Sequence, residues 1–210
     1  IEGNIKGSNN GGNNGGAGIY NYANGLITFS NGIITGGNGN LYGGEGIRNK
    51  SNGLITILNG KITGGNGSIS GGSGILLNSN GTVIILNGNI TGGNGNTDGG
   101  VRIFNSSGGT VTILNGKITG GFGNAARCYG IYNTSTGLIK ISNGKITSLG
   151  TGAFHYPIRG GNIILDNCII YGIHANVPAI YESTAKNVKC MNVWSNRDLH
   201  SNITNLIPGG

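Results

Sequence analysis

Apolar residues recur along this chain at a constant interval of 28 residues, separated by short runs of glycine and asparagine. Successive copies of a sequence like GLITILNGKITGGNG begin at Gly25, Gly53, Gly81, Gly109 and Gly137. Ile or Val fills the third and tenth positions of each copy and the twenty-third position of the first four copies, and the fifth position is apolar. A spacing of two is strand periodicity, and β-branched residues suit strands. With turn signals such as Asn-Gly and Gly-Gly between them, these segments predict short strands at fixed places in a winding coil.

The repeat defines how the chain is organised. Its register is regular over residues 25–136 and degenerate over 137–185, and residues 3–24 form the second half of a preceding copy. Residues 186–210 then form a final half coil and a C-terminal tail or cap. A single coil cannot bury its own apolar face, so stability requires stacking on neighbouring coils. The sequence predicts an all-β parallel β-solenoid over residues 1–185, with about seven coils and three short strands per coil.

The composition agrees with this architecture. Glycine accounts for 46 of 210 residues and charged residues for 9%, against about 25% in an ordinary soluble domain. Glycine and asparagine are poor helix formers, and three prolines exclude collagen. No apolar run approaches the roughly 20 residues of a membrane-spanning helix. With 36% hydrophobic residues the chain is expected to fold, its glycines serving the tight turns at coil corners.

The LNGKITGGNG blocks and the GGxGI stretches before each new copy resemble the right-handed parallel β-helix group, the pectate-lyase-like superfamily. More closely, they resemble the Gly/Asn-rich repeats of bacterial and archaeal cell-surface and adhesin-like proteins. The resemblance covers residues 3–185 and implies an extracellular or cell-surface location. β-Helix enzymes, as the resemblance also implies, cluster acidic or basic residues on one face.

Acidic residues are too few and too scattered to favour an enzyme. Hydrolysis of a glycoside needs two carboxylates about 5–10 Å apart, and no designed pair is evident. Asp166 and Glu182 are the one pair that falls in the irregular end. The six acids are Glu2, Glu45, Asp98, Asp166, Glu182 and Asp198. We therefore expect no catalytic residue, no metal site and no cofactor.

Residues 153–159, with the sequence AFHYPIR, interrupt the repeat and carry the most catalytic-looking side chains. His155, Tyr156 and Arg159 face Asp166 or Glu182 in one interpretation; in the other, the segment is an insertion that ends the regular stack. Three cysteines show no metal-binding spacing. They are Cys128, Cys168 and Cys190, and a disulfide between the last two and three free thiols both remain open.

Four columns of the repeat are expected to lie outside the apolar core. The twenty-fourth position forms an aromatic stripe, an outward row of large groups that either suits a partner or a sugar ring or is covered by a loop or the C-terminal tail: Tyr20, Arg48, Leu76, Phe104, Tyr132 and Tyr181. The ninth position forms a basic column: Lys61, Lys117 and Lys145. The seventh position forms a candidate asparagine ladder: Asn31, Asn59, Asn87, Asn115 and Asn143. A threonine column at the eleventh position, Thr35 to Thr147, is expected to face solvent.

Three functions are compatible with these features. The leading one is a non-catalytic extracellular structural or adhesive protein, self-assembling end to end into a fibre or surface layer if the first strand edge is open. The second is a carbohydrate-binding module that recognises anionic polysaccharide through an aromatic and basic face. The third is a degenerate polysaccharide lyase or hydrolase. The net charge of +7 favours polysaccharide or a cell envelope as partner, and its dispersal disfavours nucleic acid.

Overall fold

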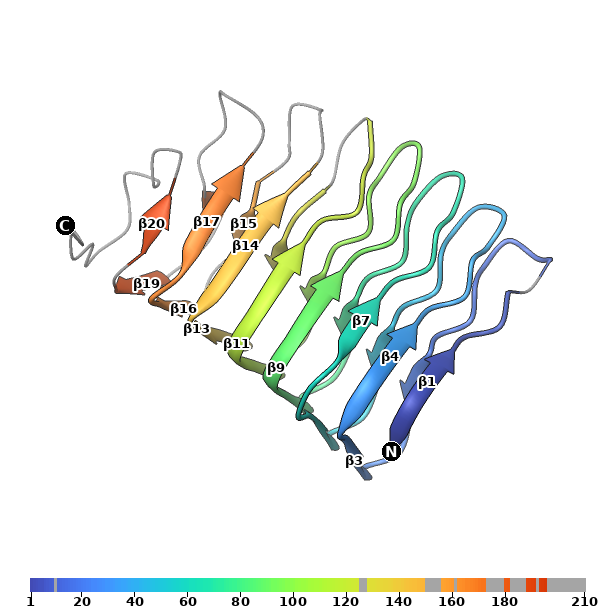
Figure 1. The fold of residues 1–210 in the computed structure, drawn as a ribbon, viewed down its shortest axis with the longest axis horizontal. Coiled ribbons are helices and arrows are strands. Elements are labelled where there is room, and N and C mark those ends of the chain that lie inside the picture. Colours follow the sequence, from blue (N-terminus) through green and yellow to red (C-terminus); the bar gives the residue numbers. More distant parts are fainter. Residues whose placement is uncertain are drawn as a thin grey trace.

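The chain winds into a parallel β-solenoid of about six turns, slightly fewer than the predicted seven (Figure 1). The computed structural model describes residues 1–9, 11–124, 128–149, 156–160, 162–172, 180–181, 188–191 and 193–195. Every strand pairing among them is parallel, and the described residues form no helix. The predicted fold class is confirmed, as is the solenoid that the family resemblance implies.

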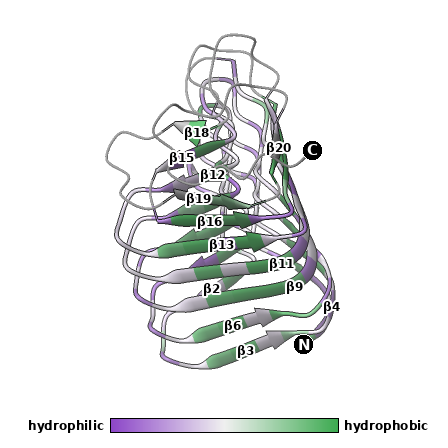
Figure 2. Cartoon of the chain, turned by 90° about the vertical axis from the view of Figure 1, so that its left-hand side faces the viewer, coloured by the Kyte–Doolittle hydropathy of each residue, from purple (hydrophilic) through white to green (hydrophobic). Residues whose placement is uncertain are grey.

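Each full coil contributes three strand segments, which stack into three walls. The first wall (Figure 2) contains β3 (Leu26–Phe29), β6 (Leu54–Ile57), β9 (Thr82–Thr91), β11 (Thr110–Thr119), β13 (Leu138–Ser142), β16 (Ile163–Asp166) and β19 (Val188–Met191). The second contains β1 (Glu2–Lys6), β4 (Asn31–Thr35), β7 (Lys61–Thr63), the second halves of β9 and β11, β14 (Gly144–Ser148), β17 (Ile169–Gly172) and β20 (Trp194–Ser195). The third contains β2 (Ile19–Asn21), β5 (Ile47–Asn49), β8 (Ile75–Leu77), β10 (Ile103–Asn105), β12 (Ile131–Asn133), β15 (Ile158–Gly160) and β18 (Ile180–Tyr181).

The first two walls belong to one 13-stranded sheet, and the third wall is a separate seven-stranded sheet. Residues 28 apart lie opposite each other through the regular copies, as Ile62, Ile90 and Ile118 do in the second wall. After β13 the interval shortens, because Ile139 pairs with Ile163. Core residues therefore still lie opposite core residues in these later coils, although each coil contains fewer residues.

The apolar columns form one continuous core between the walls. Their members in the regular copies are fully buried, except for Ile27 of the first copy, which is only partly buried. Burial of one such side chain contributes roughly 1.5–3 kcal/mol. Each isoleucine is buried because it packs on its equivalent in the next coil, so the stacking of coils provides this stabilisation.

The corner between the first and second walls is built from Asn-Gly in more than one way. Gly32 and Gly60 turn with φ of 128° and 153°, and Asn143 turns with φ of 53°. In β9 and β11 the strand continues through the corner without interruption. The predicted positive φ at this turn is thus used in some coils and dispensed with in others.

Between the second and third walls the chain leaves the core and returns as a narrow glycine arm. We define the arms as residues 36–46, 64–74, 92–102 and 120–130, of which 125–127 lie outside the described residues. In the second arm Gly72 donates its N–H to the Gly65 carbonyl of the same coil, 2.8 Å away, and Gly65 donates to Gly44 of the preceding coil, also at 2.8 Å. A Cβ on Gly64 would lie 2.0 Å from the Gly72 carbonyl oxygen.

The arms correct the expectation that the glycines mainly serve tight corners. In the second arm backbone packs directly on backbone, both within the coil and between coils, and leaves no room for a side chain at Gly64 or Gly65. In Figure 1 these arms are the coloured loops along the upper edge that run from light blue to yellow-green. Glycine is needed there for close approach.

Candidate functional site

The aromatic stripe lies on the outer side of the third wall, where its members stand on successive strands. Tyr20 pairs with Arg48, Arg48 with Leu76, and the row continues through Phe104 to Tyr132. The register then places Arg159 opposite Tyr132 and the backbone of Tyr181 opposite Arg159. Arg159 is therefore a member of the stripe that the sequence analysis assigned to the AFHYPIR patch instead.

Exposure along the stripe is uneven. Tyr20 is 50% exposed, Leu76 is only 7% exposed, and Arg48, Phe104 and Tyr132 are half-buried. The strand register places these residues in one row, but Leu76 is buried and closes the surface between its neighbours. The stripe thus consists of two separate groups, one on each side of Leu76.

The group on the C-terminal side is a stack of rings and a guanidinium. The rings of Phe104 and Tyr132 are nearly parallel, 7° apart with centroids separated by 5.2 Å. The Arg159 guanidinium lies 5.0 Å from the Tyr132 ring centroid and 5.3 Å from that of Tyr129, and it donates to the Tyr129 hydroxyl at 2.6 Å. Buried Tyr129 in turn stacks on Tyr156. The ring faces are turned toward one another along the solenoid axis, so Tyr132 has Phe104 on one side and Arg159 on the other.

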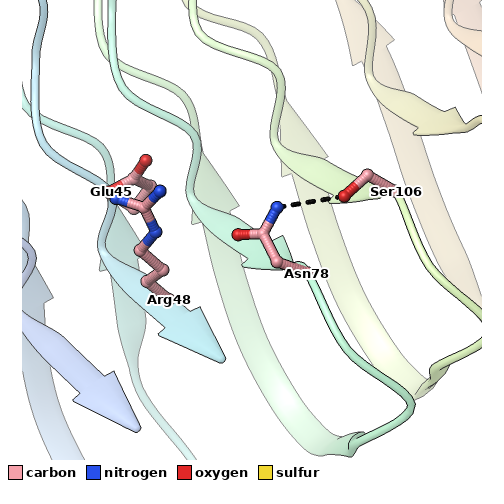
Figure 3. Close-up of polar contacts among 4 residues, drawn as sticks. All are labelled: Glu45, Arg48, Asn78 and Ser106. Carbon is pink, nitrogen blue, oxygen red and sulfur yellow. Dashed lines mark hydrogen bonds and ion pairs between the residues drawn. The ribbon is translucent and has the colours of Figure 1, made fainter. Parts of the chain in front are cut away.

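The N-terminal group is smaller and more polar. The Arg48 guanidinium lies 5.8 Å from the Tyr20 ring centroid and forms a 3.8 Å ion pair with Glu45. Figure 3 shows this pair beside Asn78, which donates to the Ser106 hydroxyl of the next coil at 3.0 Å. Cation–π and exposed ion-pair contacts of this kind each contribute about 1 kcal/mol or less.

The basic column stands on the second wall, in a different sheet from the stripe. Lys61 on β7 is followed in register by Asn89, Lys117 and Lys145, and all four side chains are exposed. The structure therefore does not bring the aromatic stripe and the basic column onto one face.

The asparagines form ladders, of which the seventh-position column is only one. There Asn59 donates to Asn31 at 3.4 Å, while Asn115 donates to the Leu86 carbonyl. At the fourteenth position the Asn38 and Asn66 side chains each accept the N–H of the next asparagine in the column at 2.8 Å. A further, buried column caps the turn into the next copy: Asn21, Asn49, Asn105 and Asn133. The regular spacing of these two extra columns was visible in the sequence.

The threonines of the eleventh position are less exposed than predicted. Thr147 is buried, and the hydroxyls of Thr63, Thr119 and Thr147 are buried without a hydrogen-bond partner. Thr63 and Thr119 are each followed at once by the first glycine of an arm.

The catalytic-looking patch is only partly described. His155 and Glu182 lie outside the described residues, as does the Tyr181 side chain; Tyr156 is buried, and Arg159 is engaged with Tyr129. Asp166 ends β16 in the 13-stranded sheet, whereas Arg159 stands in the seven-stranded sheet. Asp198 and the tail from residue 196 onward also lie outside the described residues.

All three cysteines are buried free thiols. Burial raises the pKa of Cys128, Cys168 and Cys190, the last to about 11, so each thiol is protonated at neutral pH. Cys168 adds to the shift at Cys190, which indicates that the two side chains are neighbours in the core. Protonated, buried thiols are poor nucleophiles.

The sequence analysis missed a fully buried arginine, Arg102. Arg102 occupies the column that elsewhere holds Gly18, Gly46, Gly74 and Gly130, and this break in the repeat was its signal. Its guanidinium donates to the Tyr129 carbonyl, while Nε and the second terminal nitrogen have no partner. Burial lowers the pKa of Arg102 to about 9, against an opposing effect of Cys128.

Neither a metal centre nor a membrane-spanning helix is found in the part of the chain that the structure describes. No three His, Cys, Asp or Glu side chains there are grouped to hold an ion. No helix there has the length and apolar character that crossing a bilayer requires. The chain matches no protein-family model, no curated protein and no solved structure. Its class, a parallel β-solenoid, is therefore defined by its fold.

Proposed function

We propose that this chain is a rigid, non-catalytic structural or adhesive rod in an extracellular or cell-surface setting. The observation that carries the proposal is the continuity of the contacts from coil to coil. Core isoleucines, arm backbones and outer side chains all repeat in register along the axis. Ser79, Ser107 and Ser135 each donate to the backbone carbonyl of the preceding serine in their column, outside the apolar core. Because the same contacts hold every coil to the next, the solenoid is expected to resist bending and stretching as one rod.

Pulling single molecules by atomic force microscopy, with the chain between two marker domains, tests this role. Parallel strands stacked across the pulling direction resist until a coil detaches, so we expect force peaks separated by multiples of about 100 Å, the extended length of one coil. Extension without a force peak would contradict a mechanical role. Self-association into filaments stays a prediction, to be checked by electron microscopy over a range of concentrations.

The enzymatic alternative has its own test. Wild type and Asp166→Asn are incubated with pectin-like polymers, and degradation by the wild type that is lost in Asp166→Asn would replace the proposed role with a catalytic one. The carbohydrate-binding alternative is checked on a glycan array with Tyr132→Ala. The mutual stacking of Phe104, Tyr132 and Arg159 leaves few free ring faces for a sugar and favours the rod.

A further inference from the structure

The second wall carries exposed cations that form no ion pair with any acidic residue in the part of the chain that the structure describes. Between β4 and β17 its strands contain no Asp or Glu, and Glu2 on β1 is the acid nearest in this wall. Lys117 and Lys145 lie opposite each other on adjacent strands, where like charges repel. The ion pair between Arg48 and Glu45 is on the third wall. The wall therefore presents a positive potential to an anionic partner.

Exposed apolar side chains share this face with the lysines. Ile33 and Ile169 stand in the same column, 42% and 46% exposed, and Tyr171 on β17 is 42% exposed. We call the outward residues Ile33, Lys61, Lys117, Lys145, Ile169 and Tyr171 the basic face. Figure 1 shows its strands side by side as a broad surface.

We propose that the basic face binds the surface of an anionic lipid bilayer. Lysines are attracted to anionic headgroups, isoleucines gain by entering the headgroup–acyl boundary, and tyrosine suits that boundary because one end is apolar and the other polar. A hydrated anionic polymer would attract the lysines but would leave the isoleucines exposed to water. The pairing of both kinds of side chain on one face selects the lipid surface, and this binding is independent of the mechanical role proposed above.

Co-sedimentation with vesicles tests the proposal. The wild type is mixed with vesicles of phosphatidylcholine alone and of phosphatidylcholine with phosphatidylglycerol, at low and high salt. We expect binding to the anionic vesicles only, and weaker binding at high salt. Lys117→Gln with Lys145→Gln lowers the partition coefficient about 30-fold, since each lysine near an anionic surface contributes about 1 kcal/mol.

A matched double variant separates the face from net charge. Lys50→Gln with Lys140→Gln removes the same charge from exposed positions outside the basic face, and we expect its partition coefficient to fall much less. Circular dichroism confirms that each variant is folded. Equal losses in the two double variants, or no binding of the wild type to anionic vesicles, would overturn the proposal.

The apolar contribution distinguishes lipid from polymer. Ile33→Asn with Ile169→Asn keeps the charge and uses the residue found at Asn89 in the same column, and it is expected to weaken vesicle binding, most visibly at high salt. Unchanged vesicle binding in this variant would overturn the lipid assignment. So would stronger binding of the wild type to a soluble polyuronate than to the anionic vesicles.

Discussion

The second and fourth glycine arms occupy the same place in the coil and are packed in opposite ways. In the second arm, residues 64–74, the two backbone segments touch directly and share the bond from Gly72 to Gly65. In the fourth, Cys128 stands where the second has Gly72, and the guanidinium of Arg102 lies where a Cβ on Gly120 would be. One arm is closed by backbone alone, and the other is held open by a charged side chain.

The comparison shows that the backbone of an arm requires hydrogen-bond partners in either arrangement. With glycine on both sides, the N–H groups of Gly64, Gly65, Gly71 and Gly72 all donate to backbone carbonyls of their own coil or an adjacent one. When a side chain enters, the Cys128 sulfur accepts the Gly99 N–H at 3.3 Å, and Arg102 donates to the Tyr129 carbonyl. The fourth arm keeps these hydrogen bonds at the cost of an unpaired buried cation. Substitutions in the second arm therefore test the need for close backbone approach, and substitutions at Arg102 test the cost of burying a cation.

The largest effect is expected from Gly64→Ala, in the closed arm. The new methyl group would overlap the Gly72 carbonyl oxygen, 2.0 Å away, so two backbone segments must separate. We expect a loss of about 3 kcal/mol in the free energy of unfolding, measured by urea denaturation. The control is Gly12→Ala, where a Cβ meets nothing within 4 Å and the outcome is neutral to slightly stabilising. Equal losses in both variants would show that close approach is not the reason for glycine.

A gain in stability is expected from Arg102→Met, in the open arm. Methionine keeps much of the volume and removes a buried cation whose Nε has no partner, so at pH 7 the free energy of unfolding should rise by about 1–3 kcal/mol. The control is Arg48→Met, which removes a half-buried arginine paired with Glu45 and should give no gain. Destabilisation by Arg102→Met would mean that the bond to the Tyr129 carbonyl outweighs the cost of burial.

The pH dependence sharpens this second prediction. The pKa of Arg102 is about 9 in the folded chain, well below its ordinary value. Between these values the unfolded chain binds a proton that the folded chain does not, so the wild type gains stability as pH rises above about 9. The advantage of Arg102→Met should stay constant below pH 9 and shrink above it, as followed by urea denaturation of both proteins in parallel.

The parts of the structure that follow the repeat were predictable from the sequence. Columns such as Ile62, Ile90 and Ile118 identify the core, because only stacked coils bring residues 28 apart together. The stripe was predictable to the same extent, as its members occupy one position of the repeat.

The parts that depend on non-repeating contacts were not predictable. Arg159 escaped the stripe because the interval from Ile131 to Ile158 departs from 28, so the register had to be seen in the pairing. Arg102 escaped because its burial depends on a space above Gly120 that only the packed arm reveals. The separation of the basic column from the aromatic stripe depends on which wall each strand joins, and the order of residues in the repeat leaves that geometry open.

The smallest effect concerns the asparagines that fasten one arm to the next. Asn66→Ala removes the amide oxygen that accepts the Asn94 N–H at 2.8 Å, and because the ladder is exposed, water replaces part of the lost bond. We expect a loss of about 1 kcal/mol in the free energy of unfolding. The control is Asn87→Ala, an exposed seventh-position asparagine on the strand corner, where the loss should stay within about 0.5 kcal/mol. A greater loss at Asn87 than at Asn66 would show that the ladder at the corner, and not the ladder in the arms, stabilises the stacking of successive coils.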